Sequence, residues 1–321
     1  MFGYLAGAFA GVIWLLGAAP LCAQDFPRSA IRLVIPLAPG DTADIAARVM
    51  GDELSRELKV PVIAINRPGG GGAIGTESVV KAKNDGYTIV FTNNAALVFR
   101  PVIDPNTATY DPARDLVPLG LATRSPSVFA IRGDAPFKDF RELVEYSKKN
   151  PGKIRVGTAG VGSVGDFSIG VINLLTGAGI TMVPFTGASP AVNSLLGGHV
   201  EGVVLALGTL SGQMRTGALR AIVMSSKFPE FPDVPTMTEL GYAQDIFGVW
   251  IAFLAPAGVP AEALNALVPA IERAVKSPGA AARLTRLGIM QDYSPPDKLL
   301  AEMRGERRRV EEISANGGFL K

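Results

Sequence analysis

The sequence predicts an α/β protein whose two lobes face each other across a cleft. Its 321 residues exceed what a single hydrophobic core usually supports. A strand, loop and helix pattern runs from residue 30 to residue 92 and restarts after Asp134. Each half contains a glycine-rich loop between a strand and a helix, at Arg67–Gly72 and at Gly160–Gly165. Two such units, with one loop each, are typical of two lobes around a cleft.

The first half has the pattern of a parallel sheet with crossover helices. Its strands are short apolar runs rich in Val and Ile, as expected for strands buried on both faces. Its first helix repeats apolar residues at helical spacing, including Ile45, Val49 and Leu54. The expected strands are Ala30–Pro36, Val60–Ile65 and Tyr87–Thr92, and the expected helices are Thr42–Lys59 and Ala73–Lys83.

The second half repeats this pattern and then returns the chain to the first lobe. A Pro-rich segment, Phe231–Pro235, precedes the apolar run Val249–Leu254, where we expect the return crossing. Lobe 1 then comprises residues 24–125 and 249–321, and lobe 2 comprises residues 126–248. The other expected helices are Phe137–Lys149, Asp166–Thr176, Pro190–Leu196, Ala261–Lys276, Gly279–Leu287 and Pro296–Asn316, and the other strands are Lys153–Thr158, Ile180–Phe185, Val200–Leu207 and Leu219–Ser225.

Composition and charge argue against several classes of protein. Apolar residues make up 48% of the chain and charged residues 19%, which fits a globular protein. The net charge is +2, and the arginines near the C-terminus lie among glutamates as on a solvated helix face, so nucleic-acid binding has little support. Cys22 is the single cysteine and His199 the single histidine. Cys22 lies in the segment that we expect to be removed on export, so the mature chain has no cysteine, and we expect no disulfide, no thiol nucleophile and no metal site.

The first 23 residues resemble a secretory signal peptide. The stretch Phe2–Ala23 has no charged side chain, and Pro20 ends its apolar run. We expect cleavage after Ala23, a mature protein that begins at Gln24, and a periplasmic location. The alternative is an uncleaved membrane anchor, because the run approaches the length that spans a bilayer.

Both glycine-rich loops match the G-x-G-x-x-G pattern of dinucleotide-binding proteins. That function also needs an acidic residue at the end of the next strand, to hold the ribose. Here those strands end at Thr92-Asn93 and at Phe185-Thr186, so we expect no nucleotide and no other cofactor. Free N–H groups at a helix start attract any anion, and a carboxylate suits them as well as a phosphate. The alternative is that these glycines only form tight turns.

The sequence offers little chemistry for an enzyme. His199 follows two glycines in an expected surface turn, and no H-E-x-x-H, G-x-S-x-G or metal-spaced cluster accompanies it. We expect a binding protein and not an enzyme. A periplasmic hydrolase that uses a Ser-Lys pair or carboxylates alone remains the alternative.

Five segments, in order and at familiar spacing, resemble the Bug-type receptors of tripartite tricarboxylate transporters. This resemblance covers Phe26 to near Lys321. It implies a type II-like periplasmic binding protein fold that closes on a small carboxylate-bearing solute, and delivery of that solute to a two-subunit integral membrane permease. We expect a monomer. A sensor subunit that presents its ligand to a membrane kinase is a second alternative. The segments are Ile31–Arg48, Asn66–Gly75, Asp85–Phe91, Val183–Gly198 and Pro229–Gly241.

The resemblance also implies which residues contact the ligand, largely through backbone amides and ordered water. In lobe 1 they follow the first and third strands. In lobe 2 they lie in the second glycine-rich loop, after the next strand, and at the strand end near Ala206. The implied contacts are Pro39, Gly40, Asp41, Asn93, Asn94, Ala95, Ala159, Gly160, Val161, Gly162, Ser163, Phe185, Thr186, Gly187 and Leu207.

Asp41 departs from the family pattern, in which a second glycine follows Gly40. Two further departures are the lack of a His after the second glycine-rich loop and of an acid near Ala206. An acidic side chain beside a bound carboxylate weakens binding unless it meets a cation or a hydroxyl. We therefore predict that Asp41 faces the cleft and favours a ligand with a donor or positive group beside its carboxylate. The alternative is that Asp41 caps the following helix, and both roles are compatible.

Overall fold

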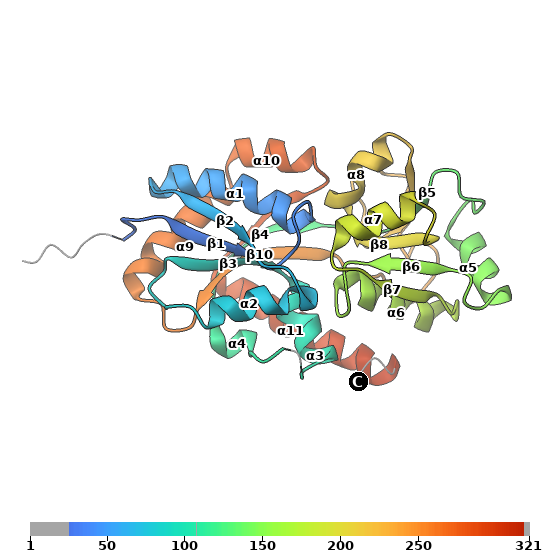
Figure 1. Cartoon of the computed structure of the whole chain (residues 1–321), viewed down its shortest axis with the longest axis horizontal. Coiled ribbons are helices and arrows are strands. Elements are labelled where there is room, and N and C mark those ends of the chain that lie inside the picture. The colour runs from blue at the N-terminus through green and yellow to red at the C-terminus, as the bar shows by residue number, and fades with distance from the viewer. Residues whose placement is uncertain (1–25, 107, 318–321) are drawn as a thin grey trace, which may run out of the picture.

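The computed structural model describes residues 26–106 and 108–317 of the chain. It has two lobes, and each lobe contains one sheet with helices on both faces (Figure 1). The first sheet has six strands in the order β11-β4-β10-β3-β1-β2, and the second has five in the order β7-β6-β8-β5-β9. The predicted two-lobe α/β fold is therefore confirmed.

The first sheet is mixed, and this corrects the expected parallel sheet. Strands β1 (Ile31–Ile35), β2 (Val62–Asn66) and β3 (Thr88–Asn93) are parallel, and β10 (Val249–Pro256) runs antiparallel to β3. The cause is the return crossing, which brings β10 in from lobe 2 against the direction of β3. Strands β4 (Leu116–Ser125) and β11 (Met290–Ser294) complete the sheet in antiparallel pairs.

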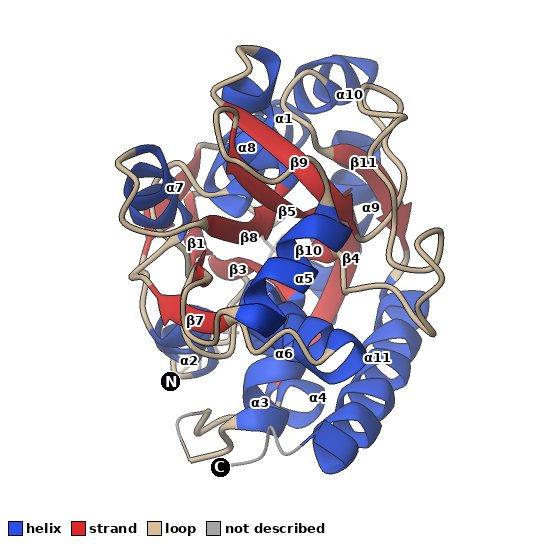
Figure 2. Cartoon of the chain, turned by 90° about the vertical axis from the view of Figure 1, so that its right-hand side faces the viewer, coloured by secondary structure: helices blue, strands red, loops and turns tan. Residues whose placement is uncertain are grey.

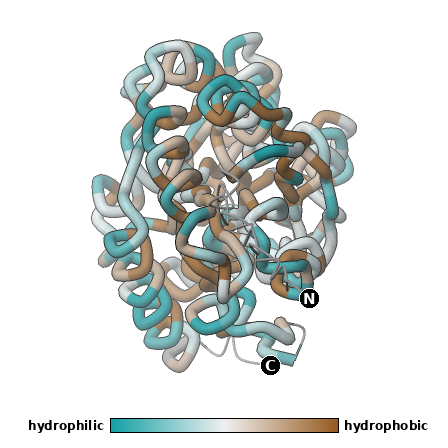
Figure 3. The backbone as a smooth tube through the Cα atoms, turned by 90° about the vertical axis from the view of Figure 1, so that its left-hand side faces the viewer, coloured by the Kyte–Doolittle hydropathy of each residue, from teal (hydrophilic) through white to brown (hydrophobic). Residues whose placement is uncertain are grey.

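Helices cover both faces of this sheet. In Figure 1, α1 and α10 lie above its strands, and α2 and α11 lie below them. Their apolar sides form one large core with the strands, and Figure 3 shows hydrophobic segments concentrated inside the molecule. The helices are α1 (Thr42–Leu58), α2 (Ala73–Val80), α3 (Arg100–Ile103), α4 (Pro112–Asp115), α9 (Ala261–Val275), α10 (Pro278–Thr285) and α11 (Pro296–Gly317), with short turns η1 (Gly70–Gly72) and η2 (Ala95–Phe99).

The second lobe repeats this arrangement around its own sheet. Figure 2, viewed from the lobe 2 side, shows α7 and α8 on one side of the strands and α5 and α6 on the other. Strand β5 is antiparallel to both β8 and β9, whereas β6 is parallel to β7 and β8. The elements are β5 (Ser127–Arg132), α5 (Phe140–Lys149), β6 (Arg155–Thr158), α6 (Val164–Thr176), β7 (Thr181–Pro184), α7 (Ala188–Leu196), β8 (Gly202–Ala206), α8 (Leu207–Arg215) and β9 (Leu219–Met224).

The chain crosses between the sheets twice, at neighbouring positions. Strand β4 ends at Ser125 and β5 begins at Ser127, while β10 begins at Val249 after the segment that leaves β9. Ser127 and Ser225 join the two crossings, because the Ser127 N–H donates to the Ser225 hydroxyl at 3.0 Å and its carbonyl accepts from the Ser225 N–H at 2.9 Å. The residue boundaries given above for lobe 1 and lobe 2 stay a prediction.

A cluster of three aromatic side chains also joins the two lobes. Phe99 comes from lobe 1, Phe167 from α6 of lobe 2, and Phe247 from the segment that leads into β10. Their ring centroids lie 5.1 to 5.4 Å apart, and all three residues are buried. Aromatic pairs at this spacing add to the stabilisation that burial gives.

Within residues 26–106 and 108–317, no helix combines the length and apolar character that a membrane span requires. The predicted signal peptide, residues 1–23, lies outside the described residues.

Candidate functional site

Two neighbouring cavities lie between the lobes. The inner cavity has a volume of about 40 Å³ and the outer cavity about 360 Å³, and the two share Leu37, Gly71 and Ala159 in their walls. The inner cavity lies among the ends of β3 and β8 and the starts of α1 and α6; the outer cavity lies between the Gly69–Gly72 loop and the loops that follow β6 and β7.

The structure brings together most of the residues that the resemblance implied. Asp41, Asn93, Ala95, Ala159 and Ser163 line the inner cavity. The outer cavity is lined by Ala159 again, with Gly160, Val161, Phe185, Thr186 and Gly187.

The other five implied residues do not line either cavity. Pro39 and Gly40 lie in the loop before α1, where the Pro39 carbonyl accepts from the Ser189 hydroxyl of lobe 2 at 3.4 Å. Leu207 follows Ala206, which does line the inner cavity. Gly162 contacts Arg100, as described below. The Asn94 side chain points away from both cavities, because its amide donates to the Gly248 carbonyl at 3.0 Å and to Glu306 at 3.2 Å.

Five helices of the described chain begin at the walls of these cavities. Asp41, Ser163 and Ala206 precede α1, α6 and α8 at the inner cavity. Gly72 and Gly187 precede α2 and α7 at the outer cavity. A helix start carries the positive end of the helix dipole. At α8 the Leu207 and Gly208 N–H groups already donate to Pro126 and Ser125, so there the dipole alone acts. The site is therefore suited to an anion, and a carboxylate meets that requirement.

Asp41 both caps α1 and faces the inner cavity. Its Oδ1 accepts from the Ala43 N–H at 3.1 Å, and the residue is 8% exposed. Burial raises the pKa of its carboxyl group to about 6; the hydrogen bond from Ala43 opposes this shift, and the nearby Asp44 adds to it. The two roles weighed for Asp41 are thus geometrically compatible, and its contact with a ligand stays a prediction.

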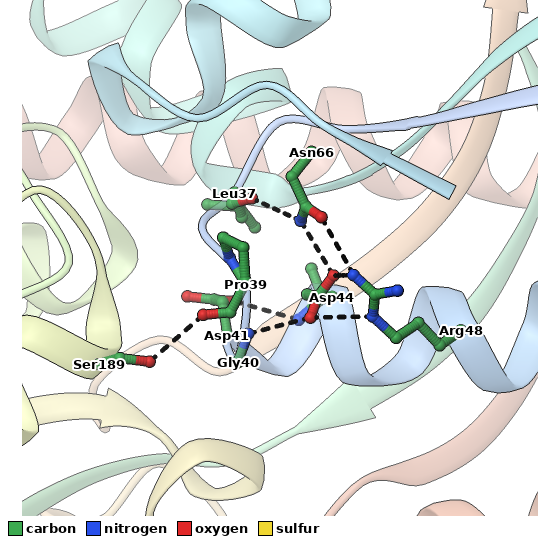
Figure 4. Close-up of polar contacts among 9 residues, drawn as sticks. Leu37, Pro39, Gly40, Asp41, Asp44, Arg48, Asn66 and Ser189 are labelled. Carbon is green, nitrogen blue, oxygen red and sulfur yellow. Dashed lines mark hydrogen bonds and ion pairs between the residues drawn. The ribbon is translucent and has the colours of Figure 1, made fainter. Parts of the chain in front are cut away.

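Asp44 holds the loop before α1 in place (Figure 4). Its carboxylate accepts from the Gly40 N–H at 2.9 Å, from Arg48 at 2.8 Å and from the Asn66 amide at 2.9 Å. The Asn66 amide also donates to the Leu37 carbonyl at 3.0 Å. Burial alone favours a raised pKa for Asp44, but these hydrogen bonds outweigh burial and lower the pKa. Asp44 therefore positions Asp41 and does not itself line either cavity.

Two polar groups in the inner wall have no hydrogen-bond partner within the described part of the chain. They are the Asn93 side-chain carbonyl and the Ser127 hydroxyl, on residues that are 9% and 1% exposed. A buried polar group without a partner costs about 1–3 kcal/mol. A ligand atom that hydrogen-bonds to these groups would remove that cost.

Arg100 is a cavity-lining residue that the sequence analysis did not name. It lies in α3, is 6% exposed, and lines the outer cavity. Its guanidinium donates to the Val161 carbonyl of lobe 2 and lies 3.3 Å from Asp104. A side chain at Gly162, whose φ is +74°, meets the Arg100 Cδ at 2.8 Å, so the contact between the lobes requires glycine there. In the sequence, the feature that could have pointed to Arg100 is its position as a single charged residue directly after the apolar run Ala95–Phe99.

Across residues 26–106 and 108–317, no group of three or more His, Cys, Asp or Glu side chains is placed to hold a metal ion. His199 is exposed in the turn after α7.

Comparisons with known proteins agree with this geometry. Residues 46–311 match the family described as the tripartite tricarboxylate transporter family receptor. The protein BugT of Bordetella pertussis is 31% identical over 294 residues, which cover 91% of this chain and 90% of BugT. The periplasmic binding protein BugD superposes with a TM-score of 0.87 at 30% identity, over 92% of this chain and 100% of BugD. MatC of Rhodopseudomonas palustris, solved with bound malate, gives a TM-score of 0.83 at 29% identity, over 90% and 99% of the two chains.

Proposed function

Because this chain belongs to the tripartite tricarboxylate transporter receptor family, we propose that it captures a small organic acid outside the cytoplasm and delivers it to a two-subunit integral membrane permease. Proteins of this family are periplasmic solute-binding receptors and not enzymes. One observation carries the carboxylate assignment: five helices begin at the walls of the two interlobe cavities.

The proposed ligand contacts are the implied residues that line the two cavities, together with Ser127 and Arg100. Contacts from both lobes are needed because the ligand must stabilise the closed arrangement of the lobes. MatC, which is similar to this chain, was solved with malate, and this supports a small carboxylate as the class of ligand.

A ligand screen tests the binding function. Purified protein is heated with each of a set of small carboxylates, including mono-, di- and hydroxy-acids, aromatic acids and amino acids. A ligand at 100 times its Kd stabilises the native state by about 2.7 kcal/mol, which raises the Tm measurably. The acid that binds is then recovered and analysed for chemical change. We expect it unchanged. Conversion to product contradicts the receptor assignment and supports the hydrolase alternative.

The proposed location depends on residues 1–23 acting as a signal peptide. Mass spectrometry of protein from the periplasmic fraction then gives a mature chain that begins at Gln24. An intact N-terminus in the membrane fraction supports the anchor instead.

Delivery to a permease is tested in cells that lack the gene. We expect them to lose uptake of the acid identified in the screen, and to regain it when the gene is restored. Normal uptake together with loss of a transcriptional response to that acid supports the sensor alternative.

A further inference from the structure

The two lobes present the same capping arrangement to the inner cavity. In each lobe a glycine N–H donates at 2.9 Å to an aspartate four positions later, and the residue after the glycine caps the next helix. The glycine and aspartate pairs are Gly40 with Asp44 and Gly162 with Asp166. The capping residues, Asp41 in lobe 1 and Ser163 in lobe 2, both line the inner cavity. At matching positions, therefore, lobe 1 offers a carboxyl group and lobe 2 a hydroxyl.

Apart from Asp41, the wall of the inner cavity suits a carboxylate. The Ser163 hydroxyl accepts from the Asp166 N–H at 3.2 Å, which leaves its own proton free to donate. The Ser127 hydroxyl and the Asn93 side-chain carbonyl lack partners among the described residues, and the Asn93 amide adds two N–H donors. Helices α1 and α6 begin at this wall and bring the positive ends of their dipoles.

The size of the inner cavity also matches a carboxylate group. Its volume is about 40 Å³, and a cavity of about 10–15 Å³ on this measure holds one water. The space is therefore equivalent to about three waters, which is enough for the two oxygens and one carbon of a carboxylate. In so small a space a bound carboxylate lies within hydrogen-bond reach of the polar groups in the wall.

Asp41 is the one residue with an ionisable side chain among the described residues of this wall. Its Oδ1 accepts from the Ala43 N–H at 3.1 Å, whereas its Oδ2 makes no hydrogen bond within the described chain. Two carboxylates that share a buried site do not both ionise, because the pKa of one of them is strongly raised. A protonated Oδ2 instead donates a hydrogen bond, and Asp41 then matches the hydroxyl of Ser163.

The surroundings of Asp41 in lobe 1 already favour the protonated form. The residue is 8% exposed, and burial raises the pKa of its carboxyl group to about 6. The nearby carboxylate of Asp44 adds to this shift, although Asp44 is itself paired with Arg48 at 2.8 Å. A bound carboxylate brings a second negative charge closer, so it raises the pKa of Asp41 further.

The facing elements place no charged side chain in the wall of the inner cavity beside Asp41, within the described chain. On α6 the Asp166 carboxylate accepts from the Gly162 N–H, and α7 has no charged residue. On α8 the one charged residue, Arg215, ends the helix and pairs with Glu230. Arg100 lines the outer cavity and not the inner one.

We propose that a carboxylate of the ligand binds in the inner cavity together with one proton, which Asp41 carries on Oδ2 and donates to that carboxylate. The proton comes from the solvent and returns to it when the acid leaves. The proposal rests on the proposed function as a carboxylate receptor. It makes Asp41 the residue that sets the pH dependence of binding, and it differs from the sequence-based prediction, in which ionised Asp41 meets a donor on the ligand.

Calorimetric titration of the wild-type protein counts the proton. The probes are succinate, malate, adipate, butanoate and benzoate, each titrated at about pH 7.5 in phosphate and in Tris, which differ in their heat of ionisation. The difference between the two observed heats gives the number of protons taken up. We expect about one proton for the acid that binds most tightly. We also expect its Kd to rise about tenfold per pH unit between about pH 7 and pH 9, because this slope equals the number of protons bound.

Two variants assign the proton to Asp41. Both Asp41→Asn and Asp41→Ser keep a helix cap and a hydrogen-bond donor but remove the titrating group. We expect both to bind the same acid without proton uptake, and therefore to bind it at least tenfold more tightly than wild type at about pH 9. The controls are Asp52→Asn, at an exposed site on α1, and Glu306→Gln, which removes another buried carboxyl group; both keep the proton uptake.

The outcomes separate the proton from the receptor function. Binding without proton uptake, or uptake that persists in Asp41→Asn, overturns the proposal and leaves the receptor function standing. Affinity that rises with pH in wild type but not in Asp41→Asn means that ionised Asp41 meets a donor on the acid, and this also overturns it. Absence of binding by every acid overturns both. The proton count uses the wild-type protein alone, so it holds even where a variant fails to fold.

Discussion

The interlobe cleft and a groove beside the hinge are two spaces between the same lobes, and their charged side chains have different partners. The hinge groove has a volume of about 570 Å³ and lies among β10, α11 and the 225–248 segment. Its charged groups have partners: Arg124 pairs with Glu302 at 2.7 Å and with Asp292, and Arg309 lies over the Phe247 ring. In the cleft, the side-chain oxygens of Asn93 and Ser127 lack partners within the described chain.

The adjacent residues Asn93 and Asn94 face the two different spaces. Asn93 ends β3 and faces the inner cavity, whereas the Asn94 amide donates to Glu306 in the hinge groove. Glu306 also accepts from the Trp250 indole at 2.7 Å. The side-chain carbonyls of both asparagines lack a partner among the described residues, so the two spaces differ in their charged groups: those of the hinge groove pair with one another, whereas Asp41 in the inner cavity accepts from a backbone N–H. Volume alone therefore does not identify a binding site.

The largest expected effect concerns the buried acid of the cleft. Burial raises the pKa of Asp41 from 3.8 to about 6, so the folded protein binds this proton more tightly than the unfolded chain. Stability is then lost as pH rises through that interval, by about 3 kcal/mol at about 1.4 kcal/mol per pKa unit. We expect Asp41→Asn to be more stable than wild type by about this amount at pH 8 and equal to it below pH 4.

Urea unfolding across that pH range measures the difference. Asp52→Asn, at an exposed site, controls for the general effect of removing an acid from α1. A constant difference between wild type and Asp41→Asn at all pH values contradicts the buried ionisation.

In the hinge groove, Glu306→Gln has a comparable pH dependence, because burial raises the pKa of Glu306 from 4.5 to about 7 despite the hydrogen bonds from Trp250 and Asn94.

A smaller effect is expected from removing the donor that Glu306 uses. In Trp250→Phe one six-membered ring is kept, but the five-membered ring of the indole and its N–H are lost, so a buried carboxylate loses its 2.7 Å hydrogen bond. We expect a loss of about 2 kcal/mol in the free energy of unfolding, with ligand affinity unchanged. The same substitution in the Glu306→Gln background has less effect, because a neutral acceptor is easier to leave unpaired. Equal losses in both backgrounds indicate that packing, not the hydrogen bond, is responsible.

The smallest expected effect tests how tightly the cleft closes. A methyl group at Gly162 collides with Arg100, so Gly162→Ala hinders the closed arrangement and is expected to weaken ligand binding by about tenfold. Gly177→Ala is a matched control, because Gly177 also has positive φ, at +66°, and a side chain there meets nothing within 4 Å. Titration of both variants gives the measurement. Equal affinities in the two variants contradict the role of the contact between Gly162 and Arg100.

Much of the fold could be predicted from the sequence, because the local spacing of apolar residues shows which side of a helix or strand is buried. Helix α1 was expected at Thr42–Lys59 and is found at Thr42–Leu58, since its apolar spacing and the following left-handed residue are both local features. Strands β4 and β5 were not assigned. Pro118 and Gly120 interrupt the pattern of β4, and its antiparallel pairing with β10 depends on residues more than 100 positions away in the chain.

For the site, the sequence by itself determined the loops, the helix starts and the presence of Asp41 in the first loop, because these follow from glycine placement and strand ends. Only the tertiary structure decided which neighbours these groups have. Arg100 and Val161 meet across the cleft although 61 positions separate them, and Asn93 and Asn94 face different spaces although they are adjacent. The physical reason is that periodicity records which side of an element is buried, whereas the partner on that side is set by how the two lobes pack together.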